Sequence, residues 1–196
     1  MSNIVTYSDF TGEINLSASN AEMQAPITAA ITRYEREFLA LLLGDKLADA
    51  MIADYTGGSP SQEALDLFNG VTAFDITISS KAVTRKWAGL KTGKAIAYYI
   101  YYKYRLENES RMSGVGQTVF KAENADRADF TEKLVTIWNK LVQLVGETPD
   151  GSVEELSLPT VHYNFDASAY NFLLVNVADY GDWLFTPFQY QNRFGL

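Results

Sequence analysis

Residues able to carry out chemistry are few in this chain of 196 residues. The sequence holds one histidine, His162, and no cysteine. A zinc site needs several histidine or cysteine ligands, and a lone histidine in an aromatic stretch is far more often a surface or packing residue than a catalyst. We therefore expect no enzyme activity, and no catalytic, cofactor-binding or metal-binding residues.

Two glycine-containing stretches invite comparison with nucleotide-binding loops. The stretch from Gly89 to Lys94 (GLKTGK) has three residues between its glycines where a P-loop has four, and Ala95 replaces the required Ser or Thr. The pattern around it also predicts a helix. The stretch from Gly114 to Val119 (GVGQTV) lacks the third glycine and the following helix of a dinucleotide-binding loop. We reject both as nucleotide sites.

Pairs of carboxylates are the remaining chemical candidates. They occur at Glu35 and Glu37, at Asp45 and Asp49, and at 154–155. Glycosidases use such pairs, but a carboxylate pair leaves no local sequence signature. Solvated helix faces explain most acidic pairs of this kind. We interpret them as surface residues, and an enzyme with paired carboxylates is the least favoured hypothesis.

The charge balance bears on nucleic-acid binding. The chain has a formal net charge of −8 and a pI of about 4.7. An acidic surface repels phosphate backbones, so tight binding of duplex DNA is not expected, although DNA could slide past such a surface. Basic residues concentrate on the helix predicted around the tyrosines, where we expect salt bridges to an acidic neighbour: Arg85, Lys86, Lys91, Lys94, Lys103 and Arg105.

Export and membrane signals are missing from the sequence pattern. The first ten residues, MSNIVTYSDF, have neither the basic nor the apolar region of a signal peptide. The longest apolar stretch, 95–102, is too short to span a bilayer. We expect a protein without a membrane segment.

Apolar spacing predicts the helices that organise the chain. Residues 1–20 read as an extended N-terminal segment with a strand-like piece at 13–16. A buried stripe predicts a first helix, with Pro26 near its start and Gly44 at its end: Ile27, Ile31, Tyr34, Phe38, Leu41 and Leu42. Further helices are predicted from Asp45 to about 54 and, after Ser61, around 64–68, while 70–80 is extended or a loop.

The longest predicted helix runs from Lys81 to about Arg111. Its tyrosines lie around more than one face. It is therefore either the central helix of a small bundle, or a helix with one face in the core and another against a neighbouring subunit. The candidates for such a subunit interface are Tyr98, Tyr101, Tyr102 and Tyr104. Asp129 is expected to cap one more helix, which Gly146 ends.

The C-terminal end is unusually aromatic. The last 36 residues, 161–196, hold ten of the 26 aromatic residues and show no helical repeat. A free tail of this kind would expose an apolar surface that soluble monomers avoid. Either it folds back on its own domain or it is an arm that lies on another subunit. We expect an arm whose partner-binding residues are Trp183, Phe185, Phe188, Tyr190 and Phe194.

These patterns predict a mainly α fold, a small helical bundle of four to five helices with extended loops and a mostly non-helical aromatic C-terminal arm. The expected division is an N-terminal extended segment at 1–20, a helical-bundle domain at 21–150 and the arm at 151–196. No internal repeat is found.

Four stretches occur in an order that is characteristic of one family. They are 37–44 with 46–50 (EFLALLLG, KLADA), 87–90 with 97–104 (WAGL, AYYIYYKY), 113–116 with 121–125, 133–135 and 138–139 (SGVG, KAENA, KLV, WN), and 183–195. In this order they resemble the head-to-tail adaptor proteins (connector or head-completion proteins) of tailed bacteriophages. The likeness is closest to those from phages of Bacteroidetes-type hosts, including the crAss-like group.

The resemblance implies a structural virion protein at the head-tail junction, which resides in the host cytoplasm during assembly. Its copies would form a ring, usually twelvefold, under the portal protein, extend the DNA channel and offer a platform for tail or stopper proteins. DNA would pass through without specific binding. The loop at 114–124, with Gly114, Gly116 and Lys121, is the candidate to face the lumen or the adjacent ring. The alternatives are a stopper or tail-completion ring protein, or a helical protein-binding module whose aromatic tail is its own lid.

Overall fold

The computed structural model describes residues 3–16, 21–78, 81–109, 112–113, 116–117, 127–146, 167–186 and 188–189. Within these residues it has six α-helices, two short 3-10 helices and two antiparallel two-stranded hairpins. The prediction of a mainly α helical bundle is confirmed. One helix more than expected, α6 (Ala169–Val175), lies in the stretch that we predicted to be a mostly non-helical arm.

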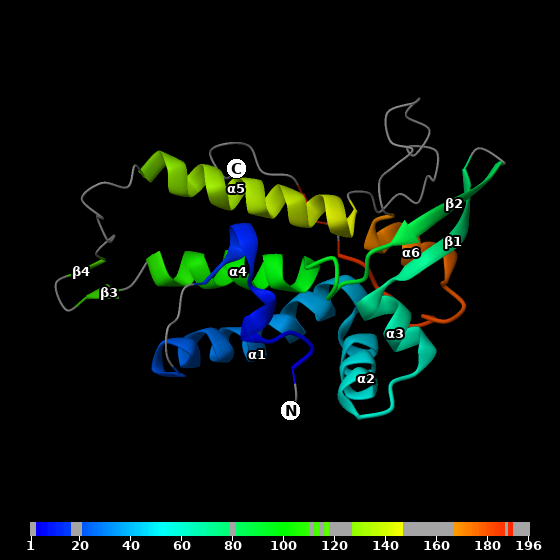
Figure 1. The fold of residues 1–196 in the computed structure, drawn as a ribbon, viewed down its shortest axis with the longest axis horizontal. Helices are drawn as coiled ribbons and strands as arrows, with labels where there is room; N and C mark the ends of the chain where they lie inside the picture. Colours follow the sequence, from blue (N-terminus) through cyan, green and yellow to red (C-terminus); the bar gives the residue numbers. More distant parts are fainter. Residues whose placement is uncertain are drawn as a thin grey trace.

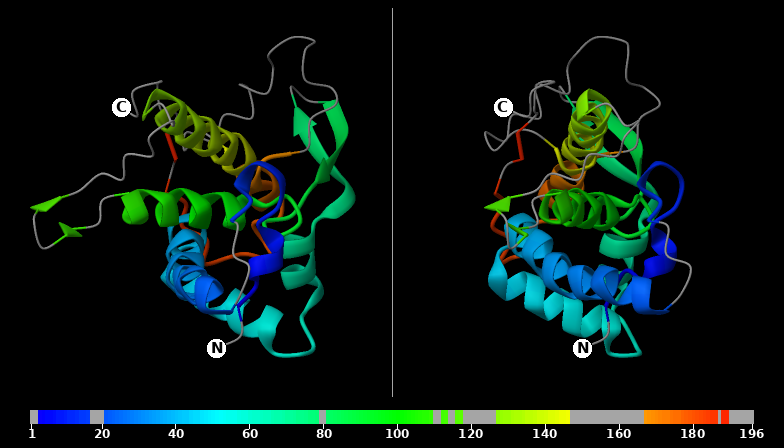
Figure 2. Two further views of the ribbon diagram at one scale, coloured as in Figure 1. Left: turned by 60° about the vertical axis from the view of Figure 1, so that its left-hand side comes forward. Right: turned by 90° about the vertical axis from the view of Figure 1, so that its left-hand side faces the viewer.

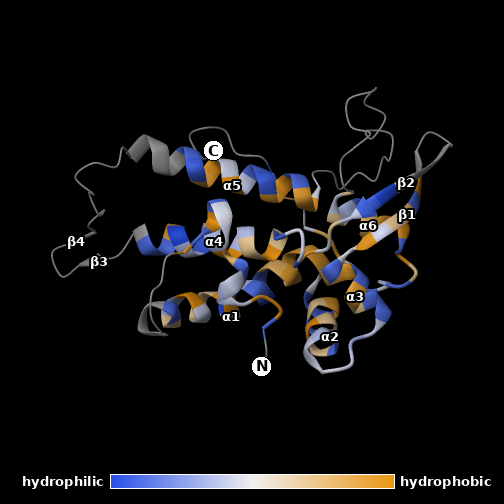
Figure 3. Cartoon of the chain, in the orientation of Figure 1, coloured by the Kyte–Doolittle hydropathy of each residue, from blue (hydrophilic) through white to orange (hydrophobic). Residues whose placement is uncertain are grey.

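Three helices form the central layer of the molecule. They are α1 (Ala21–Leu43), α4 (Ala95–Glu109) and α5 (Arg127–Val145), with α4 between the other two (Figure 1). In Figure 3 the apolar residues of α1 and α4 concentrate toward the middle of the molecule, and the polar ones toward the left-hand ends. The predicted stripe of α1 is largely buried, and α5 buries apolar residues at a similar spacing: Ile27, Ile31, Tyr34, Phe38, Leu42, Leu134, Ile137 and Leu141.

The helix boundaries agree with the predictions in part. The expectation that Asp129 caps a helix is wrong, because α5 already begins at Arg127 and Asp129 lies inside it. α1 begins at Ala21, where the expected helical domain starts, and Pro26 lies inside it. α2 (Asp45–Thr56) starts directly after Gly44, whose φ is 81°. Ser61 caps α3 (Gln62–Asn69), because its Oγ accepts the N–H of Ala64 at 3.2 Å. Short connections thus fold α2 against α1 and α3 against α2.

The prediction of one helix from Lys81 to about Arg111 is wrong. Residues Lys81–Trp87 form strand β2, which pairs antiparallel with β1 (Val71–Ile78), and α4 starts only at Ala95. The chain turns between β2 and α4 in conformations that a helix excludes, with φ of 80° at Gly89 and 66° at Lys94. The basic residues expected on one helix are therefore divided among a strand, a loop and α4.

The hairpin β1–β2 rests on α6. The ring of Trp87 stacks on that of Phe172 at 5.3 Å, and Phe74 meets Phe172 edge-on at 5.5 Å. Beside the hairpin, the N–H of Ala167 donates to the carbonyl of Lys86 at 2.7 Å. The segment before α6 is thereby joined to the edge of β2.

The two terminal segments cover opposite sides of the helical layer. We call residues 3–16 the N-terminal strap, and residues 176–186 with 188–189 the C-terminal strap. Figure 2 shows the first (dark blue) on one side of the layer and the second (red) on the other. The strand-like piece expected at 13–16 is instead part of a 3-10 helix, Gly12–Ile14, which follows another at Tyr7–Asp9. Both straps share one continuous core with the helices.

Two short strands, β3 (Met112–Ser113) and β4 (Gly116–Gln117), lie beyond the end of α4, away from the helical layer (Figure 1). Gly116 of the candidate lumen loop is in β4, while Gly114 and Lys121 fall outside the described residues. Among the described residues, none of the helices has both the length and the apolar character needed to cross a membrane.

Candidate interaction surface at the C-terminal strap

The C-terminal strap begins at α6 and runs across the end of α1. Ser168 caps α6, and after Val175 the chain turns and buries Tyr180. The Tyr180 hydroxyl donates to the carbonyl of Glu63 in α3 at 2.9 Å. The strap is thus fixed at its start to a helix more than a hundred residues earlier in the chain.

The strap completes the hydrogen bonding of the last turn of α1. Helix C-termini leave carbonyls without intrahelical donors. Here the carbonyl of Leu41 accepts the N–H of Thr186 at 2.9 Å, and that of Leu43 accepts the N–H of Leu184 at 3.1 Å. Between them, the carbonyl of Leu42 accepts Nε1–H of Trp183 at 2.9 Å. Three consecutive carbonyls are satisfied by one distant segment.

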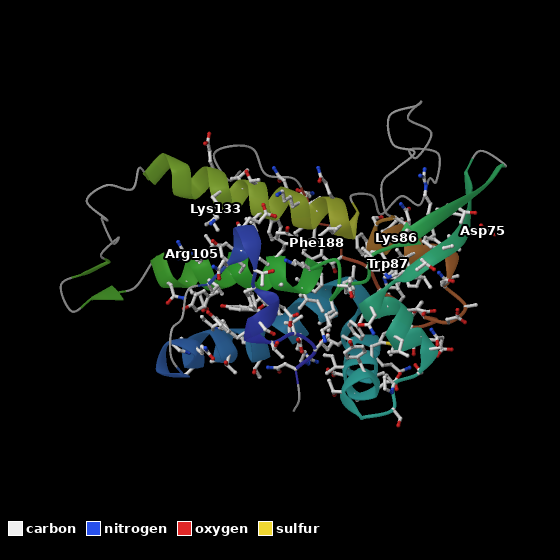
Figure 4. The ribbon with its side chains drawn as sticks, viewed as in Figure 1. Asp75, Lys86, Trp87, Arg105, Lys133 and Phe188 are labelled. Atoms are coloured by element: carbon white, nitrogen blue, oxygen red, sulfur yellow. The ribbon has the colours of Figure 1, made fainter. Side chains whose placement is uncertain are left out.

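Phe188 lies within the core of its own domain. Its side chain is 5% exposed and its ring lies 5.9 Å from that of Phe38 and 5.7 Å from that of Trp138. Trp138 also donates its Nε1–H to the carbonyl of Gln189 at 2.7 Å. Figure 4 shows Phe188 between α4 and α5. Its surface is used internally, so it has almost none to offer to a partner.

Trp183 and Phe185 are half-buried and pack on Tyr170 of α6, at ring distances of 5.5 and 5.0 Å. Of the two alternatives for the aromatic tail, folding back on its own domain describes the strap as far as residue 189. The other two expected partner-binding residues, Tyr190 and Phe194, lie outside the described residues.

Two large apolar side chains of the described strap are exposed, Val177 at 50% and, further along, Leu184. Leu184 is 72% exposed although both its neighbours, Trp183 and Phe185, are half-buried. Its side chain lies over Gly44, where a Cβ would come within 3.1 Å of the Leu184 Cβ. Beside it in the chain, Asp182 forms an ion pair with Lys46 at 2.5 Å. We call Leu184, Asp182 and Lys46 the Leu184 surface. The sequence pattern did not indicate this surface, because the aromatic residues are the conspicuous feature of the C-terminal end and Leu184 is not among them.

The tyrosines of α4 are used mainly inside the chain. Tyr101 is buried, Tyr102 packs on Trp138 at 4.7 Å, and Tyr104 is half-buried against the core. Tyr98 donates its hydroxyl to Glu13 of the N-terminal strap. This arrangement corresponds to the central-helix alternative for α4, although Tyr98, Tyr102 and Tyr104 keep part of their surface exposed.

A mixed network of charges and aromatic rings joins α1 to α4. Glu37 accepts the hydroxyl of Tyr99 at 2.6 Å and pairs with Lys103 at 2.8 Å. The Lys103 ammonium lies 5.8 Å from the ring centre of Tyr34 and 5.5 Å from that of Tyr99. Burial and the nearby Glu107 raise the pKa of Tyr34 to about 12. The network thus joins the two helices through one ion pair, one hydrogen bond and two cation–π contacts.

The loop between β2 and α4 has a structural use for its N–H groups. The N–H of Leu90 donates to the carbonyl of Leu67 and that of Lys91 to the carbonyl of Phe68, each at 2.9 Å. The loop therefore caps the end of α3 instead of offering its N–H groups to a phosphate. We therefore still interpret residues 89–94 as a structural loop and not as a P-loop. The prediction that these residues lie inside a helix is wrong, because they lie between β2 and α4.

The other chemical candidates do not converge in the described part of the chain. No group of three or more His, Cys, Asp or Glu residues there could hold a metal ion. Asp45 and Asp49 are exposed and pair with Arg36, at 3.2 and 2.8 Å. Glu37 pairs with Lys103, whereas Glu35 is buried, so the interpretation of Glu35 as a surface residue is wrong. His162 and 154–155 lie outside the described residues.

Comparisons of the chain with protein-family models, with curated proteins and with solved structures find no match.

Proposed function

We propose that this chain is a structural protein of a tailed-phage virion, a head-tail adaptor. Copies of it form a ring under the portal protein, extend the DNA channel and carry the tail or a stopper protein. The order of the four sequence stretches supports this proposal, and so does the mainly helical fold with a hairpin lying beyond the end of α4. The acidic net charge of −8 suits a channel through which DNA moves without being held.

The observation that carries the proposal is the way the C-terminal strap holds Leu184. Two main-chain N–H groups of the strap, on Leu184 and Thr186, are bonded to the end of α1, and Trp183 adds a third bond. An apolar side chain on so fixed a backbone loses little conformational entropy when a partner covers it. Burying an apolar side chain of this size in an interface typically contributes about 1.5–3 kcal/mol. The Leu184 surface is thus suited to contact the portal or an adjacent ring.

A second candidate function is favoured by the same strap. Because the aromatic residues up to Phe188 pack internally, the chain also fits a helical protein-binding module whose tail is its own lid. Such a module would use the Leu184 surface to bind one partner and would not form a ring. The two functions differ in the number of copies that assemble and in the partner that is bound. Both would use the Leu184 surface as the contact.

The test is assembly with the portal protein of the phage that this proposal implies. We expect mass photometry to find a monomer for the purified chain and a ring on addition of the portal, visible by negative-stain electron microscopy. Leu184→Asp should abolish binding while the circular dichroism spectrum stays unchanged. The matched control is Leu106→Asp, on α4, which is 44% exposed and should assemble like the unsubstituted chain.

Two results would overturn the adaptor proposal. One is a one-to-one complex with another protein and no association with the portal, which would favour the binding module. The other is full assembly of the Leu184→Asp chain, which would remove the Leu184 surface from either function.

A further inference from the structure

Glu35 ties the N-terminal strap to the middle of α1. It is 3% exposed, the one charged side chain that is buried in the described part of the chain. Its Oε1 accepts the N–H of Ile4 at 3.0 Å, and its Oε2 accepts the N–H groups of Ile4 and Val5, both at 2.9 Å. Ile4 and Val5 are themselves fully buried. One carboxyl group therefore holds the start of the strap by its main chain.

The surroundings of Glu35 disfavour its charge. Burial is the largest influence and raises the pKa of this carboxyl above its ordinary value, against the lowering effect of the N–H groups of Val5 and Ile4. Two charged side chains act on it from the elements around it. Lys91, in the loop before α4, favours the ionised form, and Asp9, in the first 3-10 helix, favours the neutral form. Opening of the strap exposes Glu35 to water, and hydration then stabilises its ionised form.

The hydrogen-bond geometry also accommodates a neutral Glu35. Oε2 by itself accepts both N–H groups, while Oε1 only shares that of Ile4. A proton can be placed on Oε1 without leaving either N–H group unsatisfied. Protonation thus removes the cost of burying a charge and keeps the anchor of the strap.

The strap lies on one outer side of the helical layer (Figure 2), so it can open while α1, α4 and α5 keep their contacts with one another. Proteins commonly open in such local units rather than as a whole. Opening breaks the bond from Lys94 to Thr11, at 2.7 Å, and the contacts of Glu13 with Lys140 and Tyr98. It also exposes five buried apolar side chains, which oppose it: Ile4, Val5, Phe10, Ile14 and Leu16. The balance between these effects depends on the charge of Glu35.

We propose that residues 3–16 form a proton-controlled strap, which closes on α1 when Glu35 takes up a proton and loosens when Glu35 ionises. A carboxyl group that is more basic in the closed state stabilises that state fully below its ordinary titration range. This stabilisation is lost as the pH rises through the titration of the closed state. The strap is thus expected to loosen at pH values above the ordinary pKa of a glutamate, as the pH approaches neutrality. The proposal concerns the chain alone and does not depend on the adaptor function.

Hydrogen exchange of the full chain between pH 4.5 and 8 tests this proposal, with rates corrected for intrinsic chemical exchange. Protection of the Ile4 and Val5 amides should fall as the pH rises, while that of the α4 amides stays level. Each unit by which closure raises the pKa of Glu35 corresponds to a tenfold change in the opening constant. Strap amides whose protection is the same at every pH, or equals that of α4 throughout, would overturn the proposal.

A substitution separates charge from hydrogen bonding. Glu35→Gln keeps an oxygen that can accept both N–H groups but cannot ionise. We expect high strap protection in this variant, without pH dependence. The matched control is Glu132→Gln, an exposed position on α5, which should retain the pH dependence of the unsubstituted chain. Loss of strap protection in Glu35→Gln at all pH values would contradict the proposal, and if this variant does not fold, the pH series on the unsubstituted chain decides.

Discussion

Trp183 donates its indole Nε1–H to the carbonyl of Leu42 at 2.9 Å, across 141 residues of sequence. The acceptor is in the last turn of α1, where a carbonyl has no donor from its own helix. The ring meanwhile packs on Tyr170. A single side chain thus caps a helix carbonyl and packs in an aromatic cluster, so the C-terminal strap is part of the fold.

Replacing Trp183 by Phe tests the hydrogen bond apart from most of the ring packing. The carbonyl of Leu42 would lose its donor, so we expect the free energy of unfolding to fall by about 1–3 kcal/mol. Urea denaturation followed by circular dichroism measures this change. The control is Tyr55→Phe, which removes an exposed hydrogen bond to Asn69 and should cost only a few tenths of a kcal/mol. Equal effects of the two substitutions would contradict the capping role.

Removing residues 182–196 distinguishes a structural strap from a detachable arm. The truncation deletes three donors to the end of α1 and empties the site of Phe188 among Phe38, Tyr99 and Trp138. Losing a buried Phe side chain alone typically costs about 3–5 kcal/mol. We therefore expect a large fall in Tm by differential scanning calorimetry. A truncated chain that melts like the full one would show that the strap contributes little and would restore the arm hypothesis.

The helices with a clear apolar stripe could be predicted from the sequence. In α1 and α5 the residues that face the core recur three or four positions apart, and Gly44 and Gly146 end the two helices as expected. The spacing of these residues along the chain is local, so the sequence pattern records it although their contacts are with other helices. The same was true of Ser61, whose capping bond spans three residues.

The parts that could not be predicted depend on distant partners. The local pattern of β2 predicts a helix, because its strand character comes from pairing with β1 and from the stack of Trp87 on Phe172. The local pattern around Glu35 predicts a surface residue, because its partners are main-chain N–H groups about thirty positions away, which no side-chain pattern reveals. The two alternatives for the C-terminal tail likewise differ only in contacts with the far end of α1.

Two glycines allow the chain to cross itself between α3 and α4. A Cβ on Gly70 would lie 2.3 Å from the carbonyl oxygen of Trp87, and one on Gly89 would lie 2.5 Å from the main chain of Asn69 and Gly70. Both residues have positive φ, at 89° and 80°. We expect alanine at either position to lower the free energy of unfolding by more than about 2 kcal/mol. The added Cβ would force neighbouring backbone to move, and the positive φ would also be strained for alanine.

A graded control for these glycines comes from elsewhere in the chain. Gly12 has a φ of 70° but nothing within 4 Å of its added Cβ, and Gly181 has neither feature. Substitution by Ala should therefore cost about 1 kcal/mol at Gly12 and close to nothing at Gly181. Thermal melting of the four variants measures the order, and a Gly70→Ala chain as stable as Gly181→Ala would show that the close approach is not tight.

Glu13 provides a pH prediction of opposite sign to that of Glu35. The ammonium of Lys140 and the hydroxyl of Tyr98 both bind its carboxylate, and they lower the pKa of Glu13 below its ordinary value. Its contribution to stability is therefore present above the ordinary glutamate pKa and is lost as the pH falls through the lowered value. Because the side chains of Glu13 and Lys140 are 37% and 43% exposed, solvent screening limits the contribution to less than about 1 kcal/mol.

Glu13→Gln should therefore lower the free energy of unfolding at pH 7 slightly, and the difference from the unsubstituted chain should vanish in acid. Urea titrations between pH 3 and pH 7 measure it, and 0.5 M salt should reduce the difference at pH 7 because the ion pair is partly exposed. The N-terminal strap thus contains two carboxyl contacts that respond to acid in opposite ways, one weakening at Glu13 and one tightening at Glu35. A difference between Glu13→Gln and the unsubstituted chain that grows toward low pH would contradict the assignment of the Lys140 and Tyr98 contacts.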